Sequence, residues 1–314
     1  MNQAQAIVAD RLTRDYPSRD GARRALDEVS FTVPYGHVVG VLGPNGAGKT
    51  TCVRILTTLL LPTSGMASVA GIDVVAKPQQ ARRVVGVSFG GETGLYPRLT
   101  GRDNLRYFST MYGLSGRRLE SRVTELLERV GLADRARDRV DTYSRGMWQR
   151  LHIARALLHD PRVLLLDEPS SGLDPGHARQ LRALVGELRD EGRAILLTTH
   201  DLVEAEEVCQ SVIILDHGRT LRDTTVRELR TEAARSVGHR IELEPRRAVP
   251  VEVLEAVPGL VRFDHSDPQI LHVYTTDAAA AASFLMGKLA DDVVSLHINT
   301  PSLAEAYLAT VGSS

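Results

Sequence analysis

Three short apolar runs in the first part of the chain are not interrupted by polar residues. They are Val38–Leu42, residues 163–166 and residues 194–197. A strand with one face in solvent alternates between apolar and polar residues, whereas uninterrupted runs of this length are typical of strands covered on both faces by helices. The sequence therefore predicts a mainly parallel sheet with helices between its strands.

Segments with apolar residues at helical spacing lie after the first run and between the second and third runs. Residues 49–61 predict a helix after a glycine-rich turn, and residues 180–189 predict another between the second and third runs. Residues 105–140, rich in Leu, Arg and Glu at helical spacing, predict an inserted helical region. The next helix has one apolar face, formed by Met147, Leu151, Ala154 and Leu158.

The N-terminal part of the chain has a different pattern. In residues 6–33 short apolar runs alternate with polar residues, which predicts a small antiparallel sheet. The charged, turn-rich residues 18–24 predict a loop between two of its strands.

A second domain is predicted after residue 231, where arginines cluster and the motifs described below end. We therefore expect domains at residues 1–231 and 232–314. The second domain shows the order β-α-β-β-α-β, followed by a last helix at residues 302–310, and this order is compatible with a split βαβ sandwich. Its predicted strands are residues 241–243, 260–263, 270–274 and 293–298, and its predicted helices begin at Pro250 and span residues 277–289.

Composition and charge narrow the classes of function. With 314 residues, 43% apolar and 25% charged, the chain is long and apolar enough for two globular domains. Thirty-eight basic and thirty-nine acidic residues give a net charge of -1, so no global field would attract nucleic acid or anionic lipid. We expect no nucleic-acid partner.

The sequence predicts a chain that stays in a reducing cytosol and does not enter a membrane itself. Its two cysteines, Cys52 and Cys209, are too few for a disulfide framework, and we interpret both as packing residues. The first residues lack the basic flank and apolar core of a signal peptide. The longest apolar stretches fall short of the roughly 20 residues that span a bilayer. If the protein serves a membrane, another chain must supply the span.

Residues 43–50 match the phosphate-binding pattern G-x-x-x-x-G-K-[ST], between a predicted strand and a predicted helix. Glycines let backbone N–H groups approach a phosphate chain, and the helix N-terminus adds a favourable dipole. Lys49 is expected to reach the terminal phosphates, and the Thr50 hydroxyl to bind Mg²⁺. The predicted nucleotide-binding residues here are Gly43, Pro44, Asn45, Gly46, Ala47, Gly48, Lys49, Thr50 and Thr51. A glycine-rich turn with an incidental lysine is the weaker alternative.

Asp167 and Glu168 follow the apolar run 163–166, at the edge of the predicted sheet where ligands of open α/β folds bind. Asp167 is expected to hold Mg²⁺, directly or through water. Glu168 would then polarise the attacking water as the general base. For the pair alone, two solvated acids at a strand end would be the default, and the phosphate loop favours the catalytic interpretation.

These motifs resemble the nucleotide-binding subunit of an ATP-binding cassette (ABC) transporter over about residues 6–230. Residues 143–147, Tyr-Ser-Arg-Gly-Met, resemble the family signature, whose usual form is LSGGQ, and depart from it at the first, third and fifth positions. The resemblance implies an α/β P-loop cassette with a helical insertion and a small antiparallel sheet, here with a small α+β C-terminal domain. It also implies that the retained Ser144 and Gly146 meet the γ-phosphate of ATP bound to an opposing protomer.

Three further positions take their expected roles from the family. Asp174, in the Ser-Gly-Leu-Asp of residues 171–174, resembles part of the loop that links the two sites across the dimer. His200 resembles the switch histidine that contacts the γ-phosphate, although taken alone it could be structural. Tyr16 resembles the aromatic residue that stacks on adenine, or it packs at a strand end.

One family position is not filled by the usual residue. The family places a glutamine after the strand predicted at residues 84–89, where it senses magnesium and couples to the membrane partner. Residues 88–92 read Ser-Phe-Gly-Gly-Glu, and we predict that Glu92 replaces this glutamine as a metal-facing residue. In residues 94–100, Leu95 and Tyr96 are candidate contacts to a membrane subunit, or they pack on the chain's own helices.

The resemblance implies an ATPase that uses ATP and Mg²⁺ and works as a head-to-tail pair, since one protomer cannot bring both motifs to the same ATP. Symmetry favours a homodimer over a related subunit. The implied partner is a separate integral membrane permease, with the cassette cytoplasmic and peripheral on the inner face of the membrane. The signature variant, Glu92 and the C-terminal domain resemble those of drug and antibiotic exporter ATPases.

Other functions stay open at this point. One is a regulatory protein that binds ATP without hydrolysing it, against which Glu168 and His200 argue, and another is an importer subunit. Cassettes that act on ribosomes usually carry two cassettes in one chain, and those of DNA repair usually carry long heptads or cysteine knuckles. Neither feature occurs in this sequence.

Overall fold

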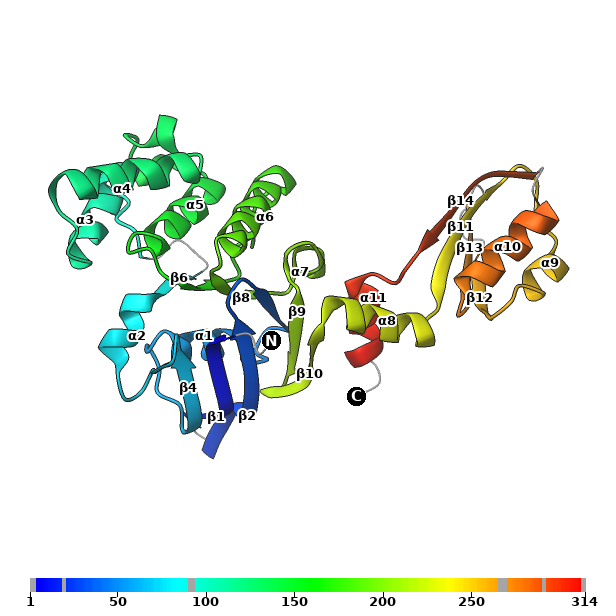
Figure 1. The fold of residues 1–314 in the computed structure, drawn as a ribbon, viewed down its shortest axis with the longest axis horizontal. Coiled ribbons are helices and arrows are strands. Elements are labelled where there is room, and N and C mark those ends of the chain that lie inside the picture. The colour runs from blue at the N-terminus through cyan, green and yellow to red at the C-terminus, as the bar shows by residue number, and fades with distance from the viewer. Residues whose placement is uncertain (1–3, 19–20, 90–93, 265–269, 290–291, 312–314) are drawn as a thin grey trace. The chain divides into compact units, whose positions relative to one another are not determined.

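The computed structural model describes residues 4–18, 21–89, 94–264, 270–289 and 292–311 (Figure 1). The chain divides into two compact units, Met1–Asp223 and Thr224–Ser314. The boundary expected between residues 231 and 232 lies inside helix α8 (Val226–Ser236). This helix packs on α11 (Leu303–Val311), so both helices belong to the second unit.

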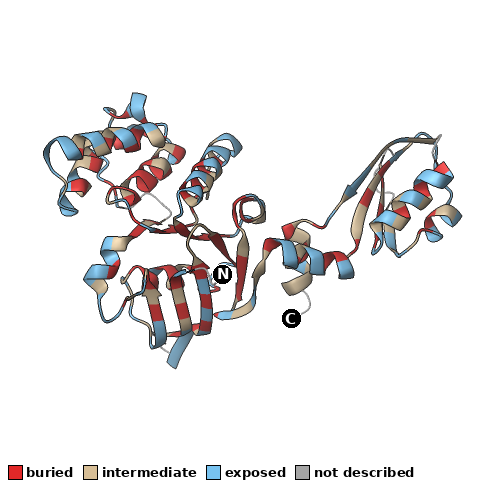
Figure 2. Ribbon diagram, in the orientation of Figure 1, coloured by how far each residue is buried: buried red, intermediate tan, exposed pale blue. Residues whose placement is uncertain are grey.

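A six-stranded sheet, in the order β10-β9-β3-β8-β7-β6, forms the centre of the first unit as far as it is described. The pairings from β6 through β7, β8 and β3 to β9 are parallel. Every residue of β3, β7 and β8 is buried, which confirms the prediction from the three apolar runs (Figure 2). The strands are β3 (Val38–Leu42), β6 (Val85–Phe89), β7 (Val163–Asp167), β8 (Ala194–Thr199), β9 (Ser211–Asp216) and β10 (Arg219–Thr225).

Helices connect and cover these strands. They are α1 (Lys49–Leu56), α2 (Pro78–Val84), α6 (Pro175–Asp190) and α7 (Leu202–Val208). The prediction that α1 continues to residue 61 is wrong. The Thr57 hydroxyl donates to the Val53 carbonyl at 2.9 Å, and Thr58 turns into the left-handed region with φ 63°, so the helix ends. As a result, Leu59 and Leu61 lie at the surface, 62% and 63% exposed.

A four-stranded antiparallel sheet, in the order β2-β1-β4-β5, packs on the central sheet through one shared apolar core. Its strands are β1 (Gln5–Ser18), β2 (Gly21–Pro34), β4 (Ser64–Val69) and β5 (Ile72–Asp73). The loop predicted at residues 18–24 is wrong, because β2 already begins at Gly21. Arg24 lies opposite Asp15 and forms an ion pair with it at 2.9 Å, so the charges of this segment extend the hairpin.

A helical insertion lies between β6 and β7, as predicted for residues 105–140. It contains α3 (Gly101–Met111), α4 (Gly116–Arg129) and α5 (Arg145–Ala156), with short 3₁₀ turns before α5. The Thr100 side chain caps α3 by accepting a hydrogen bond from the Asp103 N–H. The prediction of one apolar face on α5 is too narrow, because buried side chains surround most of this helix and include Gln149 and His152.

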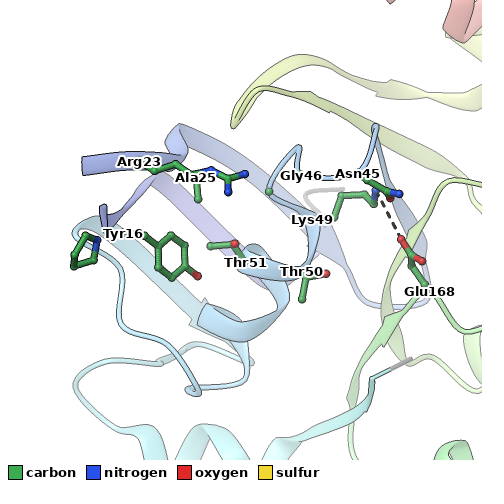
Figure 3. Close-up of a pocket in the computed structure, with 11 residues that line it drawn as sticks. Tyr16, Arg23, Ala25, Asn45, Gly46, Lys49, Thr50, Thr51 and Glu168 are labelled. Atoms are coloured by element: carbon green, nitrogen blue, oxygen red, sulfur yellow. Dashed lines mark ion pairs between the residues drawn. The ribbon is translucent and has the colours of Figure 1, made fainter. Parts of the chain in front are cut away.

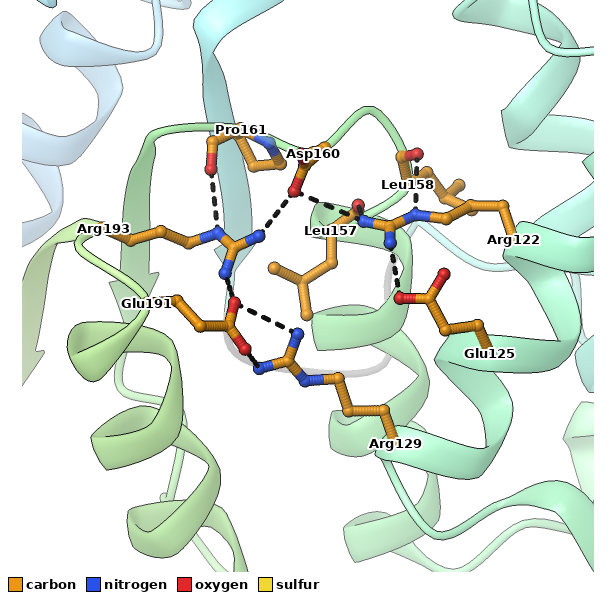
Figure 4. Close-up of polar contacts among 9 residues, drawn as sticks. All are labelled: Arg122, Glu125, Arg129, Leu157, Leu158, Asp160, Pro161, Glu191 and Arg193. Carbon is orange, nitrogen blue, oxygen red and sulfur yellow. Dashed lines mark hydrogen bonds and ion pairs between the residues drawn. The ribbon is translucent and has the colours of Figure 1, made fainter. Parts of the chain in front are cut away.

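Ion pairs between partly buried arginines and exposed acids connect the helical insertion to the neighbouring α/β elements (Figure 4). Arg122 and Arg129 of α4 pair with Asp160, after α5, and Glu191, after α6, respectively. Arg193 contacts both of these acids and is 11% exposed. Arg122 also donates to two carbonyls at the end of α5. Shared carboxylates thus connect three segments that are distant in sequence.

The second unit contains a four-stranded sheet in the order β12-β13-β11-β14 within the described residues, and these strands pair antiparallel. The elements follow the predicted β-α-β-β-α-β order, with a core of apolar side chains between the sheet and its helices. They are β11 (His239–Pro245), α9 (Val251–Glu255), β12 (Leu260–Asp264), β13 (Leu271–Thr275), α10 (Ala278–Leu289) and β14 (Val293–Asn299). The split βαβ arrangement is therefore confirmed.

Candidate active site

The phosphate loop runs from the end of β3 to the start of α1, and its backbone requires glycine. Gly43 and Gly48 have φ values of 154° and 109°. A Cβ on Gly43 would lie 2.2 Å from the Leu215 carbonyl oxygen, and a Cβ on Gly48 would lie 2.7 Å from that of Ala25. The loop is thus held close to two neighbouring backbone segments, in a conformation that L side chains rarely adopt.

Lys49, the first residue of α1, folds back across this loop. Its Nζ donates to the Gly43 carbonyl at 2.7 Å and to the Pro44 carbonyl at 3.2 Å. The side chain is 5% exposed, and burial lowers its pKa, while the nearby charges of Glu168 and Asp167 act in the opposite direction. The ammonium group is therefore fixed where the loop and the acidic strand end meet.

The side-chain oxygens of Thr50 and Asp167, which are the predicted Mg²⁺ ligands, come together from α1 and β7. The Thr50 hydroxyl donates to Asp167 Oδ1 at 3.3 Å, and the Thr198 hydroxyl from β8 donates to the same oxygen. Asp167 is 6% exposed, so these oxygens are fixed. Among the described residues no three His, Cys, Asp or Glu side chains form a metal cluster. Mg²⁺ does not require one, because it binds through one or two protein oxygens together with phosphates and water.

Glu168 occupies a strained turn immediately after β7. Its φ is 49°, in the left-handed region that residues other than glycine seldom adopt. Its N–H donates to the backbone and hydroxyl oxygens of Thr198, at 3.0 and 3.1 Å, which hold the turn. The carboxylate then lies 3.9 Å from Lys49 Nζ and 3.4 Å from Nδ1 of His200. The fold therefore brings together three residues predicted to be catalytic.

A cavity of about 490 Å³ opens beside these residues (Figure 3). The guanidinium of Arg14 lies 4.8 Å from the centre of the Tyr16 ring, so this ring is held from one side by a cation–π contact. The cavity is lined by Tyr16, Pro17, Arg23, Ala25, Asn45, Gly46, Gly48, Lys49, Thr50, Thr51 and Glu168.

Ser144, Gly146 and Asp174 are not among the residues that line this cavity. Ser144 begins α5, where its hydroxyl accepts a hydrogen bond from the Met147 N–H at 3.3 Å. Asp174 begins α6 and accepts two backbone N–H groups, and hydrogen bonding by His177 lowers its pKa. Both residues are exposed at helix N-termini. The predicted metal-facing Glu92 lies outside the described residues.

Arg145, at the third signature position, lies across Gly172 in the segment predicted to link the two sites. A Cβ on Gly172 would be 2.2 Å from Arg145 Nη1, so the guanidinium rests against the glycine backbone. The arginine that replaces the usual signature glycine therefore joins two motifs within one protomer.

Three residues that line the cavity, Pro17, Arg23 and Ala25, were not predicted as site residues from the sequence. All three lie in the loop predicted at residues 18–24 or next to it, and a predicted loop does not define the direction in which a side chain points. Arg23 can be identified once the hairpin register is known, because it is paired with Tyr16 and its side chain therefore projects from the same face of the sheet.

A phosphate loop, an acidic strand end and a histidine after the next strand, on a parallel sheet with a helical insertion, define a P-loop ATPase of the cassette class. The ABC transporter domain family matches residues 26–171. ABC transporter ATP-binding protein NatA of Bacillus subtilis is 41% identical over 67% of this chain and 85% of its own length. The chain belongs to the ABC transporter ATP-binding subunits.

Similarity also extends through the second unit. Daunorubicin/doxorubicin resistance ATP-binding protein DrrA of Streptomyces peucetius is 38% identical over 92% of this chain and 88% of its own. A solved ATP-binding subunit of an ABC transporter has a TM-score of 0.64 and 32% identity, covering 72% of this chain and 92% of that one. A dimeric cassette bound to ADP and phosphate after hydrolysis has a TM-score of 0.65 and 27% identity, covering 70% of this chain and 98% of that one.

The chain is thus an ATP-hydrolysing subunit of an ABC transporter, and it uses ATP and Mg²⁺. Subunits of this family form dimers and work with membrane permeases. No described helix of this chain has the length and hydrophobicity needed to span a membrane.

Proposed function

We propose that two copies of this chain power a separate membrane permease that exports hydrophobic small molecules, such as drugs or antibiotics. The observation that carries this proposal is the 38% identity to a daunorubicin and doxorubicin resistance ATP-binding protein over 92% of the chain. That similarity includes the C-terminal unit as well as the cassette. The cassette would then lie on the cytoplasmic face of the membrane and contact it through the permease.

The proposed chemistry follows from the contacts around Glu168. Lys49 and the loop N–H groups would bind the terminal phosphates, and Thr50 with Asp167 would hold Mg²⁺, which neutralises phosphate charge when bound. Glu168 would accept a proton from the attacking water. Its carboxylate lies 3.4 Å from His200 Nδ1, which supports a role for His200 in orienting this base beside the γ-phosphate.

The remaining site residues are assigned to nucleotide positioning and to the dimer. Tyr16 would stack on adenine, which its place on the cavity wall supports. Ser144 and Gly146 would meet the γ-phosphate of the partner's ATP, and Asp174 would face the opposing protomer. Hydrolysis would remove the phosphate that bridges Lys49 of one copy and Ser144 of the other, and the pair would reopen. Glu92 stays a prediction for the metal-facing position.

An apolar groove in the first unit supports a docking site for a permease helix. Its volume is about 290 Å³, and it lies where the end of α1 and β6 approach α3. Met111 and Leu59 on its rim are 63% and 62% exposed. The groove is lined by Leu56, Thr57, Leu59, Arg82, Val85, Val87, Phe108, Met111 and Tyr112.

The two candidate contacts predicted from the sequence have different surroundings. Leu95 is 6% exposed and packs inside its own chain, so it is withdrawn as a contact. Tyr96 is 45% exposed, and its hydroxyl donates to that of Tyr107 at 3.3 Å. Tyr96 therefore stays in the proposal as a residue beside the docking site.

The proposal is tested by affinity purification from detergent-solubilised membranes with tagged wild type, Met111→Glu and Glu168→Gln. We expect one polytopic membrane protein with the wild type and Glu168→Gln, and its loss with Met111→Glu. Recovery of soluble partners alone would contradict the permease assignment. If inverted vesicles that contain both chains release doxorubicin on ATP addition instead of accumulating it, the export direction is wrong and an importer is favoured.

A further inference from the structure

Arg23 lies directly across the β1–β2 hairpin from Tyr16, at the nucleotide cavity. The hairpin register pairs Tyr16 with Arg23 and Asp15 with Arg24. Side chains of paired residues project from the same face of an antiparallel sheet, and the next pair projects from the opposite face. Tyr16 and Arg23 therefore share the face that borders the cavity, and both line it.

The two consecutive arginines of β2, Arg23 and Arg24, differ in their contacts. Arg24 Nε lies 2.9 Å from Asp15 Oδ1, and its Nη1 lies 2.9 Å from Asp27 Oδ1. No hydrogen bond or ion pair joins the Arg23 side chain to another residue in the described part of the chain. Arg24 thus carries a charge that is paired with two acids, whereas Arg23 lines the cavity and has no acidic partner among the residues that the structure describes.

The Arg23 guanidinium is also close to the phosphate loop. A Cβ placed on Gly46 would lie 3.8 Å from Arg23 Nη2. Figure 3 shows the guanidinium turned toward Gly46 from the hairpin that also carries Tyr16. Arg23 therefore lies between the phosphate loop and the Tyr16 ring.

The position matches one part of a nucleotide. With adenine at Tyr16 and the terminal phosphates at Lys49, the ribose and the α-phosphate must lie between these two residues. A guanidinium presents N–H donors in a plane that fits two phosphate oxygens, and it keeps its charge at any physiological pH. Lys49 is the first cation available to the phosphate chain, and its Nζ already donates to two loop carbonyls. Arg23 can supply a second cation, closer to Tyr16.

We propose that Arg23 binds the α-phosphate side of the polyphosphate chain and sets the affinity of the cassette for ATP and ADP alike. A contact to a phosphate that both nucleotides share contributes equally to their binding, and it does not favour the transition state of hydrolysis. Its loss should therefore raise KM for ATP and Kd for ADP by the same factor and leave kcat unchanged.

The test is a calorimetric titration of the purified full chain with ADP and with the non-hydrolysable analogue AMP-PNP. Arg23→Ala is expected to weaken both by about ten-fold, as for loss of a charged hydrogen bond, and Arg23→Lys should recover part of the affinity. Arg24→Ala removes the same charge from the adjacent position and should change both Kd values by less than about two-fold. Neither permease nor dimer is needed, so the result does not depend on the proposed export function.

Equal affinities for wild type and Arg23→Ala would overturn the assignment. So would a loss confined to AMP-PNP, because that pattern places the contact at the γ-phosphate. A similar loss in Arg24→Ala would also overturn it, since the effect would then arise from net charge near the hairpin. Thermal unfolding of each variant establishes that the exposed Arg23 side chain can be replaced without loss of the fold.

Discussion

His200 Nδ1 lies 3.4 Å from Oε2 of Glu168, although the two residues come from the ends of different strands. The parallel pairing of β7 with β8 brings those ends to the same edge of the sheet. The Glu168 turn, with φ 49°, then directs the carboxylate toward His200 and Lys49. The closeness of His200 to Glu168 thus depends on the register of β7 and β8 as well as on the residue types.

Thr50→Ala is expected to raise the Mg²⁺ concentration for half-maximal ATPase activity by about ten-fold, as for other changes that disturb metal ligation. The reason is the loss of the hydroxyl that lies 3.3 Å from Asp167 Oδ1. A magnesium titration of ATPase activity measures this shift. Thr50→Ser keeps the hydroxyl and should behave as the wild type. An unchanged requirement in Thr50→Ala would remove Thr50 from the metal site.

Gly48→Ala should destabilise the cassette by about 2–4 kcal/mol, because the new Cβ requires φ 109° and would lie 2.6 Å from Leu26 Cδ2. Urea unfolding measures the change. The matched control is Gly186→Ala in α6, where no atom lies within 4 Å of the Cβ position. That control should be neutral or stabilising by up to about 1 kcal/mol. Equal stability of the two variants would contradict the described loop conformation.

Arg193→Met should lower the free energy of unfolding by up to about 1 kcal/mol, since it removes the largely buried guanidinium that joins the exposed carboxylates of Asp160 and Glu191. Hydrogen exchange should become faster in α4, which is connected through these acids. Arg117→Ala, at an exposed position of α4, is the control and should have little effect. If exchange in α4 does not change, the ion pairs do not hold the helical insertion.

The burial of His152 predicts that the protein loses stability in mild acid. It is fully buried, neither ring nitrogen has a hydrogen-bond partner among the described residues, and burial, with Arg155 nearby, lowers its pKa to about 3. The unfolded chain binds a proton near pH 6.5, whereas the folded chain does not until about pH 3. The stability that His152 contributes by staying neutral in the folded chain is therefore complete above pH 6.5 and is lost progressively as the pH falls toward 3.

Denaturant unfolding at pH 7 and pH 5 should show that His152 accounts for about 2 kcal/mol of the difference. His152→Leu should remove that part of the pH dependence. The control His217→Asn changes a histidine that is 95% exposed, and Asn tolerates its left-handed backbone, so the pH dependence should persist. A similar pH slope in the wild type and His152→Leu would contradict this account.

The central sheet and the phosphate site could be predicted from the sequence because their signals are local. Val38–Leu42 is an uninterrupted apolar run, and residues 43–50 contain every residue type that a phosphate loop requires. The order of the C-terminal elements was also predicted correctly from the sequence.

What the sequence did not reveal depends on partners that are distant along the chain or on backbone geometry. The charges of residues 18–24 suggest a loop until the cross-strand pair of Asp15 and Arg24 is known. The early end of α1 depends on the left-handed Thr58. Arg23 could be assigned to the cavity only after the hairpin register placed it opposite Tyr16.

ATP hydrolysis and nucleotide binding by Glu168→Gln together test whether Glu168 is the general base. The amide keeps the size of the side chain and removes its basicity, so we predict a fall in kcat of at least about 100-fold. ATP binding should be retained, and a dimer should accumulate with ATP and Mg²⁺. Hydrolysis at the wild-type rate by a correctly folded Glu168→Gln protein would contradict the assignment of Glu168 as the base.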